Sequence, residues 1–206
     1  LFAALLSIAP EPQQQHALQS SSEPPLGDQI WATLLTGASV NATLQVEHQI
    51  VSVRRFSAYS HVTLCTSDVP ESERARLRKA GSAIIDVERL DAARPTPDSW
   101  FSDIYTKLRI FNMTQFATIA YVDSDAILLD ERADRIFTAC AEQGDPPLCG
   151  VRDQHNTTEG FPMVNGGVLV VQPSAEDYAQ LVAALQTRIL GRFNEQELLA
   201  VHYASR

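Results

Sequence analysis

The chain has 206 residues and a formal net charge of −9. A single domain of this length can bury about 70% of its unfolded surface. Its 45% hydrophobic and 20% charged residues are typical of a globular protein rather than a disordered or membrane-spanning one. Lysine and arginine are not gathered into a stripe, so nucleic acid is not an expected partner, and an anionic substrate would need a cation or local basic groups.

Residues 1–27 are predicted to form a flexible segment, because the stretch from Pro10 onward is rich in Pro, Gln and Ser without a hydrophobic period. The opening LFAALLSIA is compatible with the end of an apolar signal or membrane anchor, the one route by which we expect a membrane association. Sequons at Asn41, Asn112 and Asn156 fit a lumenal protein and also arise by chance. A Golgi or other secretory lumen is therefore favoured over the cytoplasm.

Strands and helices are predicted to alternate within a single domain, 28–206. Apolar β-branched runs indicate strands, and apolar positions at helical spacing indicate helices. In this part of the chain the predicted strands are 30–36, 61–66, 83–87 and 117–122, and the predicted helices are 37–55, 70–80 and 102–113. Such alternation requires an α/β fold with a Rossmann-like, mostly parallel sheet and helices on both faces. Ligands of these sheets bind at the carboxyl ends of the strands.

Two carboxylates, Asp123 and Asp125, follow the predicted strand 117–122 at that end of the sheet. Converging carboxylates repel each other, and a divalent cation relieves the repulsion by taking oxygen ligands from both. Mg²⁺ or Mn²⁺ in such sites keeps coordination positions for substrate phosphates, so the pair indicates a phosphorylated substrate. An ordinary solvated turn between two strands is the alternative interpretation.

The second half of the chain is predicted to continue the alternation. A helix is expected at 132–142, a short strand at 147–151, a strand at 168–171, and helices at 173–190 and 193–203. Asn165-Gly166 is predicted to form a tight turn. The second glycine, Gly167, suggests close approach of the backbone to a ligand, for which the Asn165 amide offers hydrogen bonds.

Several isolated residues allow more than one interpretation. Lys107 lies beside the apolar face of the helix 102–113, where a lysine is usually a solvated side chain. The polar start of the last helix, including Glu195, could hold an anion or sugar, or could only cap the helix. Cys140 and Cys149 bracket a short loop that a disulfide could close, although two free thiols fit the sequence equally well.

Five segments occur in a specific order: TLLTG, YTKLRIF, YVDSDAILL, NGGVLVVQPS and FNEQELL. In this order they resemble the glycogenin-like family 8 glycosyltransferases, and the resemblance runs from Ile30 to the end of the chain. It implies a GT-A fold, a UDP-sugar donor, a Mn²⁺ (or Mg²⁺) ion and an acceptor hydroxyl. It further implies transfer of a hexosyl group with retention of anomeric configuration.

The resemblance also assigns roles to individual residues. These are Asp123 and Asp125 for the metal; Leu34, Thr36, Ser124 and Lys107 for the nucleotide and its diphosphate; Asn165, Gly166 and Gly167 for the donor sugar; and Lys107, Glu195 and Gln196 for catalysis. Gln196 is the group expected near the reacting sugar carbon. Glu195 replaces the Asp of the family and carries its carboxylate one methylene farther from the backbone.

The chain departs from the family pattern in two places. Val40 stands where glycogenins carry a Tyr near the base, and no His-and-Gly motif supplying a third metal ligand precedes Arg206. A fragment that lacks the C-terminal part of the family is therefore expected. One alternative is a non-catalytic nucleotide-sugar-binding or lectin-like protein with an incomplete metal shell. A phosphatase of the haloacid dehalogenase type fits less well, because Ile127 occupies the position of its characteristic Thr.

Overall fold

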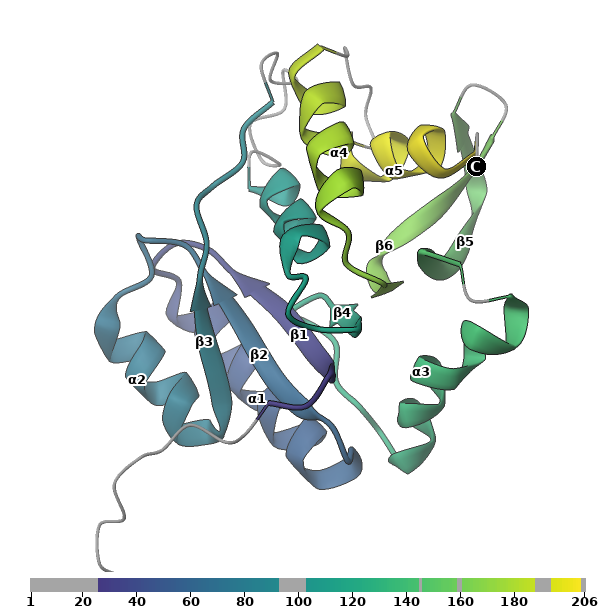
Figure 1. Ribbon diagram of the computed structural model, residues 1–206. Helices are drawn as coiled ribbons and strands as arrows, with labels where there is room; N and C mark the ends of the chain where they lie inside the picture. Colours follow the sequence, from purple (N-terminus) through teal and green to yellow (C-terminus); the bar gives the residue numbers. More distant parts are fainter. Residues whose placement is uncertain (1–25, 93–102, 145, 159–160, 188–193, 205–206) are drawn as a thin grey trace, which may run out of the picture.

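The computed structural model describes residues 26–92, 103–144, 146–158, 161–187 and 194–204 (Figure 1). The strands are β1 (Gln29–Leu35), β2 (Ser60–Cys65), β3 (Ser82–Asp86), β4 (Thr118–Val122), β5 (Leu148–Thr158) and β6 (Phe161–Val171). The helices are α1 (Val40–Phe56), α2 (Glu71–Ala80), α3 (Ile136–Ala139), α4 (Ala175–Thr187) and α5 (Asn194–Ala204), with 3₁₀ helices η2 (Ile104–Asn112), η3 (Glu131–Arg135) and η4 (Ala141–Gln143). Most of the predicted flexible segment 1–27 lies outside the described residues.

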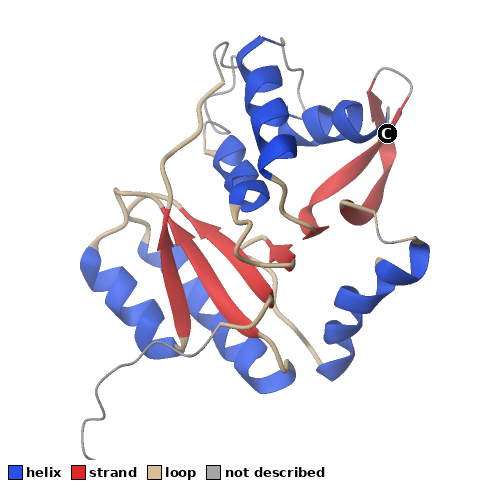
Figure 2. Ribbon diagram, viewed as in Figure 1, coloured by secondary structure: helices blue, strands red, loops and turns tan. Residues whose placement is uncertain are grey.

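One six-stranded sheet runs through the molecule in the order β3-β2-β1-β4-β6-β5 (Figure 2). The pairings β1–β2, β2–β3 and β1–β4 are parallel, whereas β6 is antiparallel to both β4 and β5. Only β6 is therefore reversed, and the predicted mostly parallel α/β sheet is confirmed. The reversal brings the middle of β6 beside the carboxyl end of β4.

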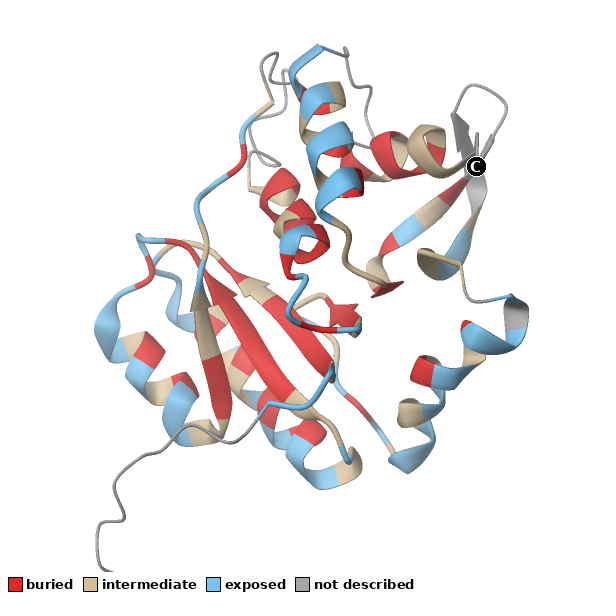
Figure 3. Ribbon diagram, in the orientation of Figure 1, coloured by how far each residue is buried: buried red, intermediate tan, exposed pale blue. Residues whose placement is uncertain are grey.

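Helices cover both faces of the sheet, because alternate residues of each strand point to opposite sides. Ile30 and Ala32 of β1 belong to a core shared with η2, α4 and α5. Their neighbour Trp31 and, farther along the strand, Leu35 pack in two cores on the α1 side. Figure 3 shows the result, with buried residues along the strands and on the inward faces of the helices.

The predicted starts and ends of the first helices are explained by local chemistry. Ser39 caps α1, because its hydroxyl accepts a hydrogen bond from the Ala42 amide at 3.3 Å. Helix α2 ends at Gly81, whose φ of 113° lies in the left-handed region that favours glycine. Gly37, between β1 and α1, also has a positive φ, of 72°.

Four predicted features of the chain are corrected by the structure. Asn165 and Gly166 do not form a turn, because they lie inside β6, which pairs with β4 on one side and β5 on the other. The expected strand at 147–151 extends to Thr158. The expected helix 132–142 is divided among η3, α3 and η4, and the helix expected at 102–113 is the 3₁₀ helix η2, which begins at Ile104.

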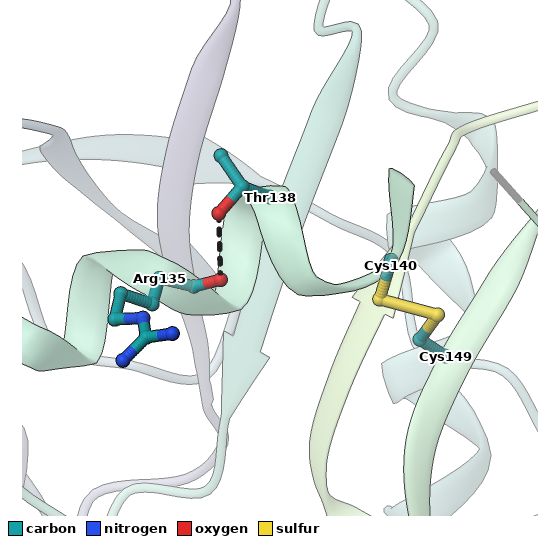
Figure 4. The surroundings of a disulfide bond; sticks show 4 residues. All are labelled: Arg135, Thr138, Cys140 and Cys149. Atoms are coloured by element: carbon teal, nitrogen blue, oxygen red, sulfur yellow. Dashed lines mark hydrogen bonds between the residues drawn. A yellow bond between two sulfur atoms is a disulfide. The ribbon is translucent and has the colours of Figure 1, made fainter. Parts of the chain in front are cut away.

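A disulfide joins Cys140 at the end of α3 to Cys149 in β5, so the structure decides between the two interpretations left open by the sequence (Figure 4). The bond ties the segment carrying α3 to the edge strand of the sheet. Cys65 is a buried free thiol, as expected, and burial raises its pKa to about 11. Within the described ranges, no helix is long and apolar enough to span a bilayer.

Candidate functional site

The two predicted metal-binding carboxylates follow β4 directly, and the first of them, Asp123, lies beside Gly167 of β6. Val122, the last residue of β4, pairs with Val168, and the Asp123 amide then donates to the Gly167 carbonyl at 2.9 Å. Antiparallel pairing thus brings Gly167 next to Asp123, although the two are distant in sequence. The structure confirms that the carboxylates stand at the carboxyl end of a central strand.

Lys107 is buried at the centre of this site and does not extend into solvent. Its ammonium nitrogen lies 2.9 Å from the Gly166 carbonyl, 3.0 Å from Asp123 Oδ1 and 3.4 Å from Glu195 Oε1. The contacts bring together η2, the end of β4, β6 and the first turn of α5. One positive charge therefore faces two carboxylates inside the protein.

Glu195 is the most enclosed carboxylate of the site, with its side chain only 1% exposed. Burial raises the pKa of this carboxyl group, and the nearby charge of Lys107 acts in the opposite direction. Among the described residues, neither Glu195 Oε2 nor Gln196 Oε1 has a hydrogen-bond partner, although both atoms are buried. Buried acceptors are normally satisfied, so these two are candidates for receiving hydrogen bonds from a ligand.

Close contacts within the site leave little room for a side chain at either glycine of β6. A Cβ atom added to Gly166 would lie 2.6 Å from Glu195 Oε1 and 3.3 Å from Lys107 Nζ. At Gly167 it would lie 3.1 Å from Asn165 Oδ1 and 3.4 Å from Asp123 Oδ2. The Asn165 side chain also accepts a hydrogen bond from the Gly167 amide at 2.9 Å. The three residues predicted to contact a donor sugar thus border the carboxylates and the lysine.

Tyr121 is a member of the site that the sequence did not reveal. Its hydroxyl donates to Asp123 Oδ1 at 3.0 Å, and its ring centre lies 5.0 Å from Lys107 Nζ. Burial, followed by the charge of Asp123, raises the pKa of Tyr121 well above its usual value, so the phenol stays protonated. Asp123 Oδ1 is consequently held by two donors, which fixes the orientation of this carboxylate.

The carboxylate pair fits a hard divalent cation that leaves positions open for other oxygen ligands. Asp123 is partly exposed, with its side chain 41% accessible, and both Asp125 and the half-buried Ser124 lie on the same turn. In the described part of the chain, no three His, Cys, Asp or Glu side chains are grouped to hold a metal ion. The described residues could therefore supply two carboxylates, with water or phosphate oxygens completing the shell.

Of Leu34 and Thr36, the residues predicted for the nucleoside pocket, Thr36 belongs to a separate polar cluster at the end of β1. The Thr36 hydroxyl donates to Asp103 at 3.0 Å, and Arg89 bridges Asp103 to Asp68. A hydrogen bond from Thr66, with further help from Arg89, lowers the pKa of Asp68 to about 2. Leu34 is half-buried and packs against the main core. None of the contacts described for these residues reaches Lys107.

The curated relatives with names are glycosyltransferases, although no protein-family model matches the chain. Galactinol synthase 1 of Solanum lycopersicum is 26% identical over 172 residues, covering 73% of this chain and 52% of the relative. Inositol phosphorylceramide glucuronosyltransferase 1 of Arabidopsis thaliana is 24% identical and matches 69% of this chain and 24% of the relative. An uncharacterized protein of Acanthamoeba polyphaga mimivirus is 24% identical, with 72% and 57% covered. The chain thus spans between about a quarter and just over half of the length of these relatives.

Solved glycosyltransferases share the arrangement of strands and helices. The glycosyltransferase GlyE of Streptococcus pneumoniae matches 84% of this chain and 43% of its own with a TM-score of 0.57 and 18% identity. The galactosyltransferase LgtC, solved with donor and acceptor sugar analogs, matches 82% of this chain and 69% of its own with a TM-score of 0.51 and 14% identity. The protein therefore has the fold of the GT-A glycosyltransferases.

Proposed function

We propose that this protein is a metal-dependent retaining glycosyltransferase of the glycogenin-like family 8, which transfers a hexosyl group from a UDP-sugar to an acceptor hydroxyl. The observation that carries the proposal is the cluster of Lys107, Asp123 and Glu195 against the Gly166-Gly167 backbone. It brings together a buried cation, the carboxylates of Asp123 and Glu195, and two unpartnered buried acceptors. The named relatives and the shared fold support the same reaction class.

The proposed donor lies across the site from the end of β1 toward α5. Leu34, Thr36 and Ser124 would border the nucleoside, and Lys107 would contact the diphosphate. A Mn²⁺ or Mg²⁺ ion held by Asp123 and Asp125 would supply positive charge to the leaving diphosphate. Asn165 and the glycine pair would border the sugar, whose hydroxyls could donate to the unpartnered oxygens of Glu195 and Gln196.

The chemical step breaks the bond between the anomeric carbon and the diphosphate oxygen, and its electron pair leaves with UDP. The acceptor oxygen attacks from the same face, and its proton passes to the departing diphosphate, so no enzyme nucleophile is needed. Lys107 would offset negative charge where it develops on the leaving diphosphate. We assign Glu195 to positioning rather than attack, because its Oε1 is already paired with Lys107.

The direct test is UDP release from a panel of UDP-sugars, measured with Mn²⁺ and with a chelator, beside calorimetry of UDP binding. We expect Mn²⁺-dependent UDP binding and slow Mn²⁺-dependent hydrolysis of at least one UDP-sugar. Binding without any turnover would favour the non-catalytic nucleotide-sugar-binding alternative, which is consistent with the two-carboxylate site in the described residues. No UDP binding with or without metal would contradict both interpretations.

A further inference from the structure

Gln49 is a buried polar residue on the inner face of α1 that contacts the turn carrying the two carboxylates. Its amide nitrogen donates to the Asp123 carbonyl at 2.9 Å and to the Ala126 carbonyl at 3.0 Å. The side chain is 1% exposed. Carbonyl oxygens only accept hydrogen bonds, so these contacts use both hydrogens of the amide group and identify which end faces the turn.

The oxygen of the Gln49 amide contacts His61 of β2, which in turn contacts Ser82 of β3. The amide oxygen lies 3.2 Å from His61 Nε2, and His61 Nδ1 lies 2.9 Å from the Ser82 hydroxyl. Because the amide oxygen accepts, His61 must donate from Nε2. Burial lowers the pKa of His61, so its ring is neutral, and the orientation of Gln49 is fixed from both sides.

The turn is held at its start by the Asp123 amide, which donates to the Gly167 carbonyl, and by the two donors on Asp123 Oδ1; the described contacts of its remaining backbone are fewer. The Ala126 amide donates to the Asp123 carbonyl at 3.1 Å, which closes the turn on itself. The next hydrogen bond to α1 along the chain comes after the turn, at Leu128, whose amide donates to the Ser52 hydroxyl at 3.0 Å. Between these points the backbone of Asp123 and Ala126 is tied to α1 by the Gln49 side chain.

We propose that Gln49 is a positioning residue that fixes the turn from Asp123 to Ala126, and with it the spacing of the two candidate metal ligands. The contact reaches the backbone and leaves the carboxylates free, so it would act on their placement without competing for the ion. The effect on the turn follows from the contacts of Gln49 alone. The effect on ligand binding rests on the proposed function.

The test compares Gln49→Met, which keeps the length of the side chain and removes both donors, with Val46→Ala. Val46 is a buried residue one turn earlier on α1 and belongs to the core shared with α2, so this variant controls for a general loss of stability. Gln49→Asn, which keeps an amide one methylene too short, replaces Gln49→Met if that protein does not fold. The readouts are amide hydrogen exchange of residues 123–126 without ligand, and Mn²⁺-dependent UDP affinity by calorimetry.

We expect exchange at the Ala126 amide to be at least about tenfold faster in Gln49→Met than in Val46→Ala, and Mn²⁺-dependent UDP binding to weaken by about tenfold or more. Equal exchange rates in the two variants would overturn the inference. Faster exchange with unchanged Mn²⁺-dependent UDP affinity would also overturn it, because the turn would then not determine binding. If exchange is faster and the unmodified protein binds no UDP, the positioning of the turn stands and the proposed function fails.

Discussion

At the scale of single residues, the charge of Lys107 determines whether the site is stable. The ammonium group is the one cation in contact with Glu195 and Asp123 among the interactions described, and Glu195 is almost completely buried. Removing one partner of a buried ion pair leaves an uncompensated charge, which typically costs about 3–5 kcal/mol. The proposed catalytic role and the stability of the fold therefore involve the same side chain, so activity and stability must be measured together in its variants.

We expect Lys107→Met to lower both stability and activity. The double variant Lys107→Met/Glu195→Gln should recover most of the stability but not the activity. The single variant should lose roughly 2–4 kcal/mol of transition-state stabilisation, the loss expected for one preorganised group facing the leaving diphosphate. Urea unfolding and UDP release, measured on all three proteins, provide the comparison. Full activity in Lys107→Met would show that the lysine has only a structural role.

Asp123→Asn and Asp125→Asn should each abolish most of the metal-dependent part of UDP binding. We expect a loss of at least about tenfold, a loss seen even for groups one step removed from a metal. Asp125 is exposed, so its variant should keep the stability of the unmodified protein. Calorimetry of UDP with and without Mn²⁺ measures the effect, and the exposed Glu131→Gln serves as a control. Unchanged Mn²⁺-dependent affinity in both Asp variants would contradict the metal assignment.

At the scale of secondary-structure elements, β6 brings the separate parts of the site together. It is the one reversed strand of the sheet, and its glycines touch residues from η2, from the end of β4 and from α5. The site would be blocked by side chains at these positions, since the neighbouring atoms already stand at contact distance. The strand thus provides a backbone surface against which Lys107 and Glu195 pack.

Gly166→Ala is expected to displace Glu195 or Lys107 and to reduce UDP-sugar turnover at least about tenfold. The added methyl group would stand 2.6 Å from Glu195 Oε1, and overpacking of this kind costs about 1–3 kcal/mol. Gly27→Ala is the matched control, because the nearest atom to its added Cβ is 3.9 Å away. The measurement is UDP release at saturating donor. Equal rates in Gly166→Ala and the unmodified protein would show that this contact is not needed for turnover.

Much of the element order could be predicted, because strands and helices with regular burial carry their own periodicity. The strand that ends just before Asp123 is predictable from its apolar run, which is buried on both faces in the structure. The turn predicted at Asn165-Gly166 is wrong, although this dipeptide is typical of turns. The local sequence does not reveal that strands β4 and β5 pair with β6 on either side. Tertiary pairing overrides the local preference there.

The predicted site residues depend largely on the family resemblance, and the structure brings most of them together. Tyr121 and Gln49 escaped prediction for a physical reason. Tyr121 sits in an apolar strand, where a tyrosine is ordinarily a core residue, and Gln49 reaches Asp123 across 74 residues of sequence. Periodicity along the chain reports which face of an element is buried, and it carries no information on such distant partners.

At the scale of the whole molecule, burial of His61 should make stability depend on pH. Burial lowers the pKa of His61 from 6.5 to about 3 in the folded protein. Between these values the unfolded chain binds a proton that the folded protein does not, so stability falls as the pH drops below about 6.5. The slope should approach about 1.4 kcal/mol per pH unit for this one residue.

His61→Gln, which keeps hydrogen-bonding groups and cannot ionise, should remove this component. Urea unfolding at pH 7 and pH 5 is expected to show an acid-induced loss that is larger in the unmodified protein by about 2 kcal/mol. The carboxylates titrate in both proteins and cancel in the comparison. Identical losses would mean that His61 is protonated in the folded protein or is not buried.

The order of the sheet also has a consequence for the speed at which the site forms. Strands β1, β2 and β3 pair over short stretches of chain, whereas Lys107 and Glu195 are separated by 88 residues and Asp123 meets Gly167 only after β6 has reversed. Contacts that close long loops form late in folding. Strands β1, β2 and β3 can therefore assemble while the carboxylates and the lysine still lack their partners. Interactions made that late chiefly slow unfolding, so the buried ion pair would lengthen the lifetime of the folded protein more than it hastens folding.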